Sequence, residues 1–196
     1  MKKAKKVVAL ALCAVMLVVG SVAGTMAYLT STTAVATNTF SVGNVKITLD
    51  EAPVDDYGAV VAGDRVTANS YKLIPGHEYV KDPIVHVAAG SEESWLFVRV
   101  TNAITGIEAP TSIYDQMTTG DNAKWVLVAG DAAEGVYAYK TKVEAGKDYT
   151  VFEKFKIQGG ADLTSYNSGK TITVQAYAVQ ADGFDTYGEA WEEAPA

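Results

Sequence analysis

The chain has two histidines, His77 and His86, and the first is followed directly by a carboxylate, Glu78. A His-Glu pair begins the helical zinc-protease motif, in which a second histidine four residues after the first binds the same metal ion. That position holds Lys81, and nearby prolines disfavour the required helix. His77, Glu78 and His86 would therefore have to form a looser zinc site, and the sequence favours ordinary strand or surface histidines.

Two acidic loops contain the carboxylates that Ca²⁺ prefers as ligands. Their acidic residues are Asp55, Asp56 and Asp64 in the first loop, and Asp182, Asp185 and Glu189 in the second. Neither loop has the spacing of an EF-hand. Solvated turn residues are the favoured interpretation, and weak calcium binding outside cells is the alternative.

Other catalytic motifs are missing from the sequence. It has no Gly-x-Ser-x-Gly elbow and no glycine-rich phosphate loop. The single cysteine, Cys13, lies in an apolar leader, so the mature chain has no thiol, disulfide or cysteine metal cluster. We therefore predict that the protein is not an enzyme and has no catalytic residue, metal or cofactor.

Residues 1–27 have the organisation of a secretory signal peptide: four lysines, an apolar run at residues 7–19, and small residues ending in Thr25 and Ala27. The run is shorter than the ~20 residues of a membrane-spanning helix. We predict cleavage between Ala27 and Tyr28, secretion, and contact with the membrane only through the signal peptide. A retained anchor is the alternative, because residues 7–27 would just span a bilayer if uncut.

Cleavage leaves 169 residues with 12 basic and 23 acidic side chains, a formal charge of −11. This length fits one domain with a sizeable core. The acidity disfavours nucleic acid and anionic membrane surfaces as partners.

Residues 45–196 predict one all-β domain, an antiparallel β-sandwich of jelly-roll type with a few short helical turns. Alternating apolar and polar residues bounded by turn signals indicate short strands. We expect strands at residues 45–50, 65–73, 79–87, 95–101, 124–128, 136–143, 149–157 and 171–180. Helical turns are expected at residues 110–117, 161–166 and 186–193. Pro83 cannot donate to a ladder, so its strand should lie at an edge or be broken.

The segment at residues 95–101 has the strongest strand pattern. Leu96, Val98 and Val100 should share one face, with Phe97 on the other. Near the C-terminus, Trp191 should pack back onto the domain from the short helix.

Residues 28–44 lie between the leader and the first strand. Residues 28–40 contain five threonines and no charge, proline or glycine. This composition favours an extended strand, but its small side chains lack the bulk to nucleate a core. We interpret the segment as an extended N-terminal arm.

Several short motifs, in order along nearly the whole chain, resemble the TasA/camelysin family of Gram-positive bacteria. They are residues 24–30 (GTMAYLT), 37–45 (TNTFSVGNV), 73–76 (LIPG), 81–83 (KDP), 90–92 (GSE), 97–100 (FVRV) and 175–184 (QAYAVQADGF). The resemblance implies a leader cut by the signal peptidase SipW and a jelly-roll domain at the cell surface or in the extracellular matrix.

The same resemblance implies self-assembly, because family members include the major protein fibre of biofilms. Their mature N-terminal segment inserts as a strand into a neighbouring subunit, and the matching residues here are 28–40. Backbone hydrogen bonds would supply affinity, and side chains such as Tyr28, Leu29, Val35 and Phe40 would set the register.

Two alternatives remain open. Camelysin has been described as a surface metalloprotease, but this sequence has no convincing zinc set, so the activity is not carried over. The second alternative is a monomeric adhesion or glycan-binding module, in which exposed members of the eleven tyrosines and three tryptophans would contact sugars.

Overall fold

The computed structural model describes residues 44–194 except 111, 165 and 167–169. The predicted signal peptide, the cleavage site at Ala27 and Tyr28, and the arm side chains Leu29, Val35 and Phe40 lie outside the described residues. In the part that is described, no helix has the length and apolar character needed to cross a bilayer.

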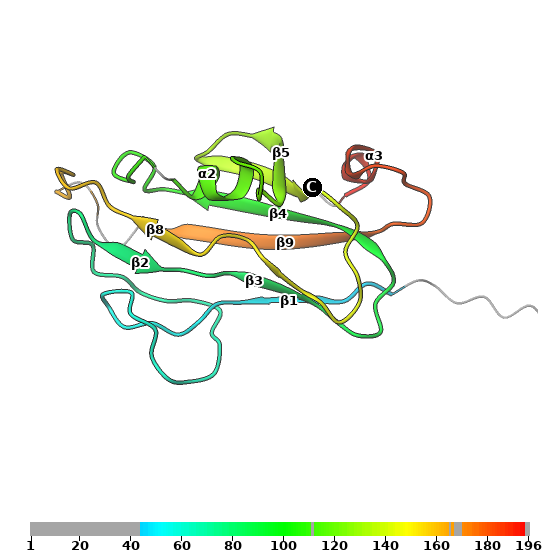
Figure 1. The fold of residues 1–196 in the computed structure, drawn as a ribbon, viewed down its shortest axis with the longest axis horizontal. Coiled ribbons are helices and arrows are strands. Elements are labelled where there is room, and N and C mark those ends of the chain that lie inside the picture. Colours follow the sequence, from blue (N-terminus) through cyan, green and yellow to red (C-terminus); the bar gives the residue numbers. More distant parts are fainter. Residues whose placement is uncertain (1–43, 111, 165, 167–169, 195–196) are drawn as a thin grey trace, which may run out of the picture. The chain divides into compact units, whose positions relative to one another are not determined.

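The domain is built from antiparallel strands and two short helices, which confirms the all-β prediction (Figure 1). A four-stranded sheet has the order β5 (Trp125–Gly130), β6 (Glu134–Tyr139), β4 (Ser94–Asn102), β9 (Ile172–Gln180). A three-stranded sheet has the order β1 (Ile47–Asp50), β3 (Ile84–Val87), β7 (Asp148–Thr150). A third sheet pairs β2 (Glu78–Val80) with β8 (Lys154–Lys156). The helices are α2 (Ile113–Thr118) and α3 (Tyr187–Glu192).

The strand pairs β2–β8 and β3–β7 are the two halves of one long antiparallel pairing that is interrupted in the middle. Pro83 separates β2 from β3, as expected for a residue without an N–H group. Opposite it, the strand expected at residues 149–157 divides into β7 and β8. Two backbone bonds hold the segments together across the break, from Val151 N to the oxygen of Pro83 (2.9 Å) and from Lys81 N to the oxygen of Glu153 (3.1 Å).

The strand expected at residues 65–73 does not form, and this prediction is wrong. Only Val66 makes a bridge, to Glu51. The polar side chains of this segment bind other parts of the chain instead of leaving the backbone to pair. Arg65 binds Asp50 and Asp82, and the Tyr71 hydroxyl donates to the oxygen of Val80.

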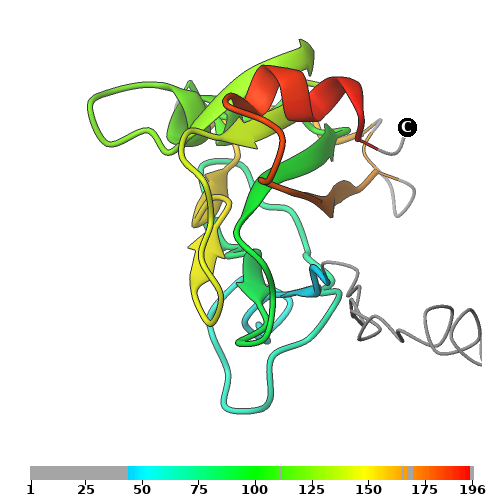
Figure 2. The same ribbon diagram turned by 90° about the vertical axis from the view of Figure 1, so that its right-hand side faces the viewer.

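Strand β4 has both faces covered, because it lies between two apolar clusters. Leu96, Val98 and Val100 belong to the main core, which also includes side chains of β3, β5 and β6. Phe97 lies on the opposite face, where the Trp191 ring of α3 packs 5.3 Å from it. Figure 2 shows α3 above this sheet. Both the predicted alternation and the return of Trp191 are confirmed.

Candidate functional site

The outer edge of β9 is the longest strand edge in the described part of the chain. All nine of its residues pair with β4, from Ile172 opposite Asn102 to Gln180 opposite Ser94, without a bulge. β4 is its one hydrogen-bonded neighbour among the described strands. The opposite edge strand, β5, has six residues and a register shift between Leu127 and Ala129. The β9 edge is therefore the longer and the straighter of the two.

The sequence of β9, ITVQAYAVQ, has no residue of the kinds that blunt an edge. Charged side chains, prolines and bulges usually discourage edge strands from pairing with another chain. The other edges carry such features or are very short: β1 has four residues, and β7 has three, including Asp148. β1 lies close to β9 but forms no ladder with it, so among the described strands the outer side of β9 has backbone donors and acceptors that are not paired in a sheet and suit an added strand.

Packing holds β9 in place from both faces, since Tyr177 and Val179 also pack against the second apolar cluster. Ile172, Val174, Ala176 and Ala178 are partly buried against the main core. Between them, Thr173 and Gln175 are exposed. The edge is therefore a fixed template, with free polar side chains along its first half.

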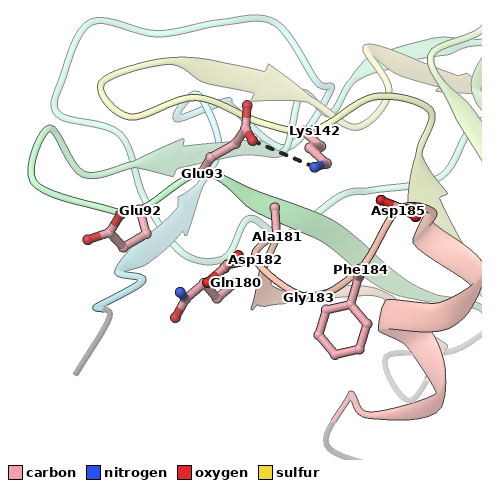
Figure 3. Close-up of a pocket in the computed structure, with 9 residues that line it drawn as sticks. All are labelled: Glu92, Glu93, Lys142, Gln180, Ala181, Asp182, Gly183, Phe184 and Asp185. Atoms are coloured by element: carbon pink, nitrogen blue, oxygen red, sulfur yellow. Dashed lines mark ion pairs between the residues drawn. The ribbon is translucent and has the colours of Figure 1, made fainter.

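The chain enters the domain beside the C-terminal end of β9. The oxygen of Asn44 accepts a hydrogen bond from Glu92 N (3.0 Å), and the oxygen of the adjacent Glu93 accepts one from Ala181 N (2.8 Å). These residues border a pocket of about 400 Å³ that is lined by Glu92, Glu93, Lys142 and residues 180–185 (Figure 3). Asn44, the first described residue, thus lies next to the end of the β9 edge.

Two acidic side chains near this pocket, those of Glu93 and Glu189, have structural partners. Lys142 lies 3.8 Å from Glu93, and the Glu189 carboxylate accepts hydrogen bonds from Asp185 N and Thr186 N at the start of α3. In the other acidic loop, Asp55 accepts from two backbone N–H groups of its own turn. These contacts agree with the interpretation of these acids as turn and cap residues.

The structure gives His77, Glu78 and His86 three different sets of partners. His77 binds the oxygen of Tyr57 (2.8 Å) and packs on Tyr79, whereas Glu78 pairs with Lys154 (3.1 Å). His86 binds two aspartates on neighbouring strands. Asp148 and Asp50 bind opposite nitrogens of the His86 ring, and within residues 44–194 as described no three His, Cys, Asp or Glu side chains are arranged so that they could hold a metal ion.

Two polar clusters were missed by the sequence analysis. The first joins His86 to Asp50 and Asp148, and the second joins Glu51 to Lys81 and Asn69. The hydrogen-bonded pairs in these clusters are separated by up to 62 residues in the chain. Only the pairing of the strands and the path of the loop after β1 bring them together, and local sequence patterns do not specify either.

Comparison with protein-family models, with curated proteins and with solved structures finds no match to this chain.

Proposed function

We propose that the protein is a secreted structural component of the cell surface or biofilm matrix, with a jelly-roll-type sandwich, that assembles into fibres by strand addition. In this proposal, residues 28–40 of one copy pair with the outer edge of β9 in the next copy. The observation that carries it is the long, straight and uncharged β9 edge. A SipW-type signal peptidase would expose the arm by cutting after Ala27.

The dimensions of the two segments support the proposal. The nine residues of β9 span about 30 Å, and thirteen extended residues span about 43 Å. The arm can therefore cover the whole edge. Neither segment has a charged residue or a proline, so backbone pairing meets neither charge repulsion nor a missing N–H group.

The position at which the arm joins the domain favours pairing with β9 of another copy over pairing with β9 of the same copy. β9 ends beside Asn44, while β1 starts there and runs away from that end. The arm would have to reverse direction sharply to pair with β9 of its own copy. In an extended continuation it is instead free to reach a second copy, which produces a head-to-tail fibre.

The test compares the mature chain, residues 28–196, with a chain that starts at residue 41. Electron microscopy of both proteins after incubation should show fibres for the first and none for the second. A double variant, Thr173→Lys with Gln175→Lys, places two charges on the exposed positions of β9 and should also abolish fibres. The matched control, Thr119→Lys with Asn122→Lys, adds the same charge at exposed positions away from this edge and should leave fibres unchanged.

Four outcomes would contradict the proposal in different ways. Fibres from the chain that starts at residue 41 would exclude the arm as donor. Fibres from the β9 double variant would exclude β9 as acceptor. A mature chain that remains monomeric at high concentration would exclude self-assembly, and zinc-dependent proteolysis lost in His77→Ala would favour the protease alternative.

A further inference from the structure

The carboxylate of Glu51, the residue that follows β1, binds both the amine of Lys81 and the carboxamide of Asn69. The Nζ atom of Lys81 donates to Oε2 of Glu51 at 2.6 Å, and Nδ2 of Asn69 donates to Oε1 of the same carboxylate at 3.0 Å. One acid group therefore touches both the nitrogen of a lysine and the nitrogen of an asparagine side chain. This arrangement places a nucleophile and a potential leaving group on the two oxygens of a single proton acceptor.

The asparagine carboxamide is held in one orientation. Its nitrogen also donates to the oxygen of Ala52 (2.8 Å), and its oxygen accepts from Val54 N (3.1 Å). If the nitrogen and the oxygen of the carboxamide were exchanged, an acceptor would face an acceptor at Glu51 and Ala52, and a donor would face a donor at Val54. The Val54 N–H group points at the carbonyl oxygen, where it would stabilise negative charge that develops when the carbonyl carbon is attacked.

The site is largely closed to water. Glu51 is 4 % exposed and Lys81 is 9 % exposed, although lysine and glutamate are seldom buried so fully. Burial raises the pKa of the neighbouring Tyr71 hydroxyl, and the charges of Glu51 and Asp82 add to this effect. A buried ion pair has a high desolvation cost. Its conversion to a neutral covalent link would remove that cost.

We propose that Lys81 and Asn69 form an intramolecular isopeptide bond, with Glu51 as the acid–base group. Glu51 takes a proton from the Lys81 ammonium group, and the free amine then attacks Cγ of Asn69. The new C–N bond forms as the carbonyl electrons move to the oxygen beside the Val54 N–H group.

Collapse of this intermediate breaks the bond between Cγ and Nδ2. Glu51 gives its proton to Nδ2, which leaves as ammonia, and it takes a proton from the attacking nitrogen. The products are the amide between Lys81 and Asn69, a protonated Glu51 carboxyl group and one molecule of ammonia. No oxidant, metal or other reactant takes part, and the shared Glu51 carboxylate holds the two groups near one another in place of a collision of free groups.

The bond would act as a staple for the longest loop region of the domain. It would join Asn69, which precedes β2, to Lys81, which follows it, and so fix the region between β1 and β2. A cross-link stabilises a fold mainly by restricting the unfolded chain. In a mature chain without cysteine, an amide could fulfil the role that a disulfide has in other secreted domains.

The test is tryptic peptide mapping of the purified, folded protein by tandem mass spectrometry. Without the bond, trypsin releases residues 66–72 and residues 73–81 as separate peptides. With it, cleavage after Lys81 is blocked, and residues 66–72 remain attached to residues 73–99. The joined species should be lighter than the sum of its two peptides by one ammonia molecule. Fragmentation should place the link between Asn69 and Lys81.

Two variants test the assigned roles. Lys81→Met removes the amine, and Glu51→Gln removes the proton acceptor with little change in shape; both should release free residues 66–72 quantitatively. Circular dichroism of each variant confirms that it is folded. If trypsin merely failed to cut after Lys81, the peptide of residues 66–72 would still be released. The presence or absence of this free peptide therefore distinguishes a missed cleavage from the cross-link.

Free residues 66–72 from the folded wild-type protein, after prolonged incubation at neutral pH, would overturn the proposal. A link from Lys81 to residues 47–65 would show instead that Glu51 is the acceptor. A bond that forms equally well in Glu51→Gln would exclude the acid–base role. None of these outcomes depends on fibre assembly, so the isopeptide bond and the proposed fibre assembly are tested independently.

Discussion

The Nδ1 atom of His86 lies 2.6 Å from Oδ1 of Asp148, which joins strand β3 to strand β7. The other ring nitrogen, Nε2, lies 3.0 Å from Oδ1 of Asp50 at the end of β1. One imidazole thus connects β1, β3 and β7, the three strands of one sheet. Arg65 binds Asp50 and Asp82 and brings a second positive charge to the cluster.

This cluster predicts that stability falls as the pH rises above neutrality. The hydrogen bond to Asp50, together with that to Asp148, raises the pKa of His86 above its ordinary value of 6.5. A raised pKa in the folded state means that the contribution is complete below about pH 6.5 and is lost as the pH rises through the higher value. For Asp50, burial opposes the hydrogen bonds from His86 and Arg65, which prevail and lower its pKa. Its contribution disappears only in acid, below about pH 3.8.

Urea denaturation at about pH 6 and about pH 9 measures this effect. The expected loss is no more than about 1 kcal/mol, because the side chains are open to water. His86→Gln should reduce the loss, whereas His77→Gln leaves the cluster intact and should retain it. An equal loss in wild type and His86→Gln would contradict the assignment.

Gly58 is predicted to tolerate no side chain. Its φ angle is +77°, and a Cβ atom there would lie 2.8 Å from the Cα and the ring of Tyr79. Tyr79 is fully buried and stacks on Phe155, so it has little room to move. Gly58→Ala should therefore lower the free energy of unfolding by about 2 kcal/mol or more, since it combines backbone strain with overpacking.

Gly120 provides the matched control for this substitution. Its φ angle is +85°, but a Cβ atom would meet nothing within 4 Å. Gly120→Ala should thus report the backbone strain alone, about 1 kcal/mol. Thermal unfolding of both variants gives the difference, and equal losses would mean that the contact with Tyr79 relaxes without cost.

The charge of the proposed mature chain leads to a prediction about assembly. Each copy of residues 28–196 has a formal charge of −11, so copies repel one another. Between about 10 mM and about 150 mM salt, the screening length falls from about 30 Å to about 8 Å. Fibre growth followed by light scattering should accelerate over this range. Slower growth at higher salt would mean that attractive charge pairs dominate the contact.

The strands that local sequence predicted well are those with a regular alternation of side chains. β1 and β9 are half-buried strands, which impose this period, and β4 keeps it at Leu96, Val98 and Val100 although both of its faces are covered. The pattern failed at residues 65–73, where Arg65, Asn69 and Tyr71 bind distant groups. Side-chain hydrogen bonds of this kind compete with the backbone hydrogen bonds of a strand, and the strand propensity of the local sequence does not predict them.

The candidate edge could not be predicted for a related reason. β4 and β9 each have nine residues and an alternating pattern, yet one is central and the other is at the edge. Strand order depends on long-range pairing. The absence of charge in β9 was visible in the sequence, but it becomes informative only once β9 is known to lie at an edge.

The last prediction concerns helix α3 as the cover of the larger sheet. Trp191 packs 5.3 Å from the buried ring of Phe97, and Thr186 and Glu189 form a capping box that starts the helix. Trp191→Ala should cost about 2 kcal/mol, less than a fully buried tryptophan, because its side chain is partly exposed. The control Glu192→Ala lies on the exposed side of the same helix and should change stability by less than about 0.5 kcal/mol. Urea denaturation followed by circular dichroism compares the two. Equal, small effects would mean that α3 is dispensable, and that the face of β4 with Phe97 does not need this cover.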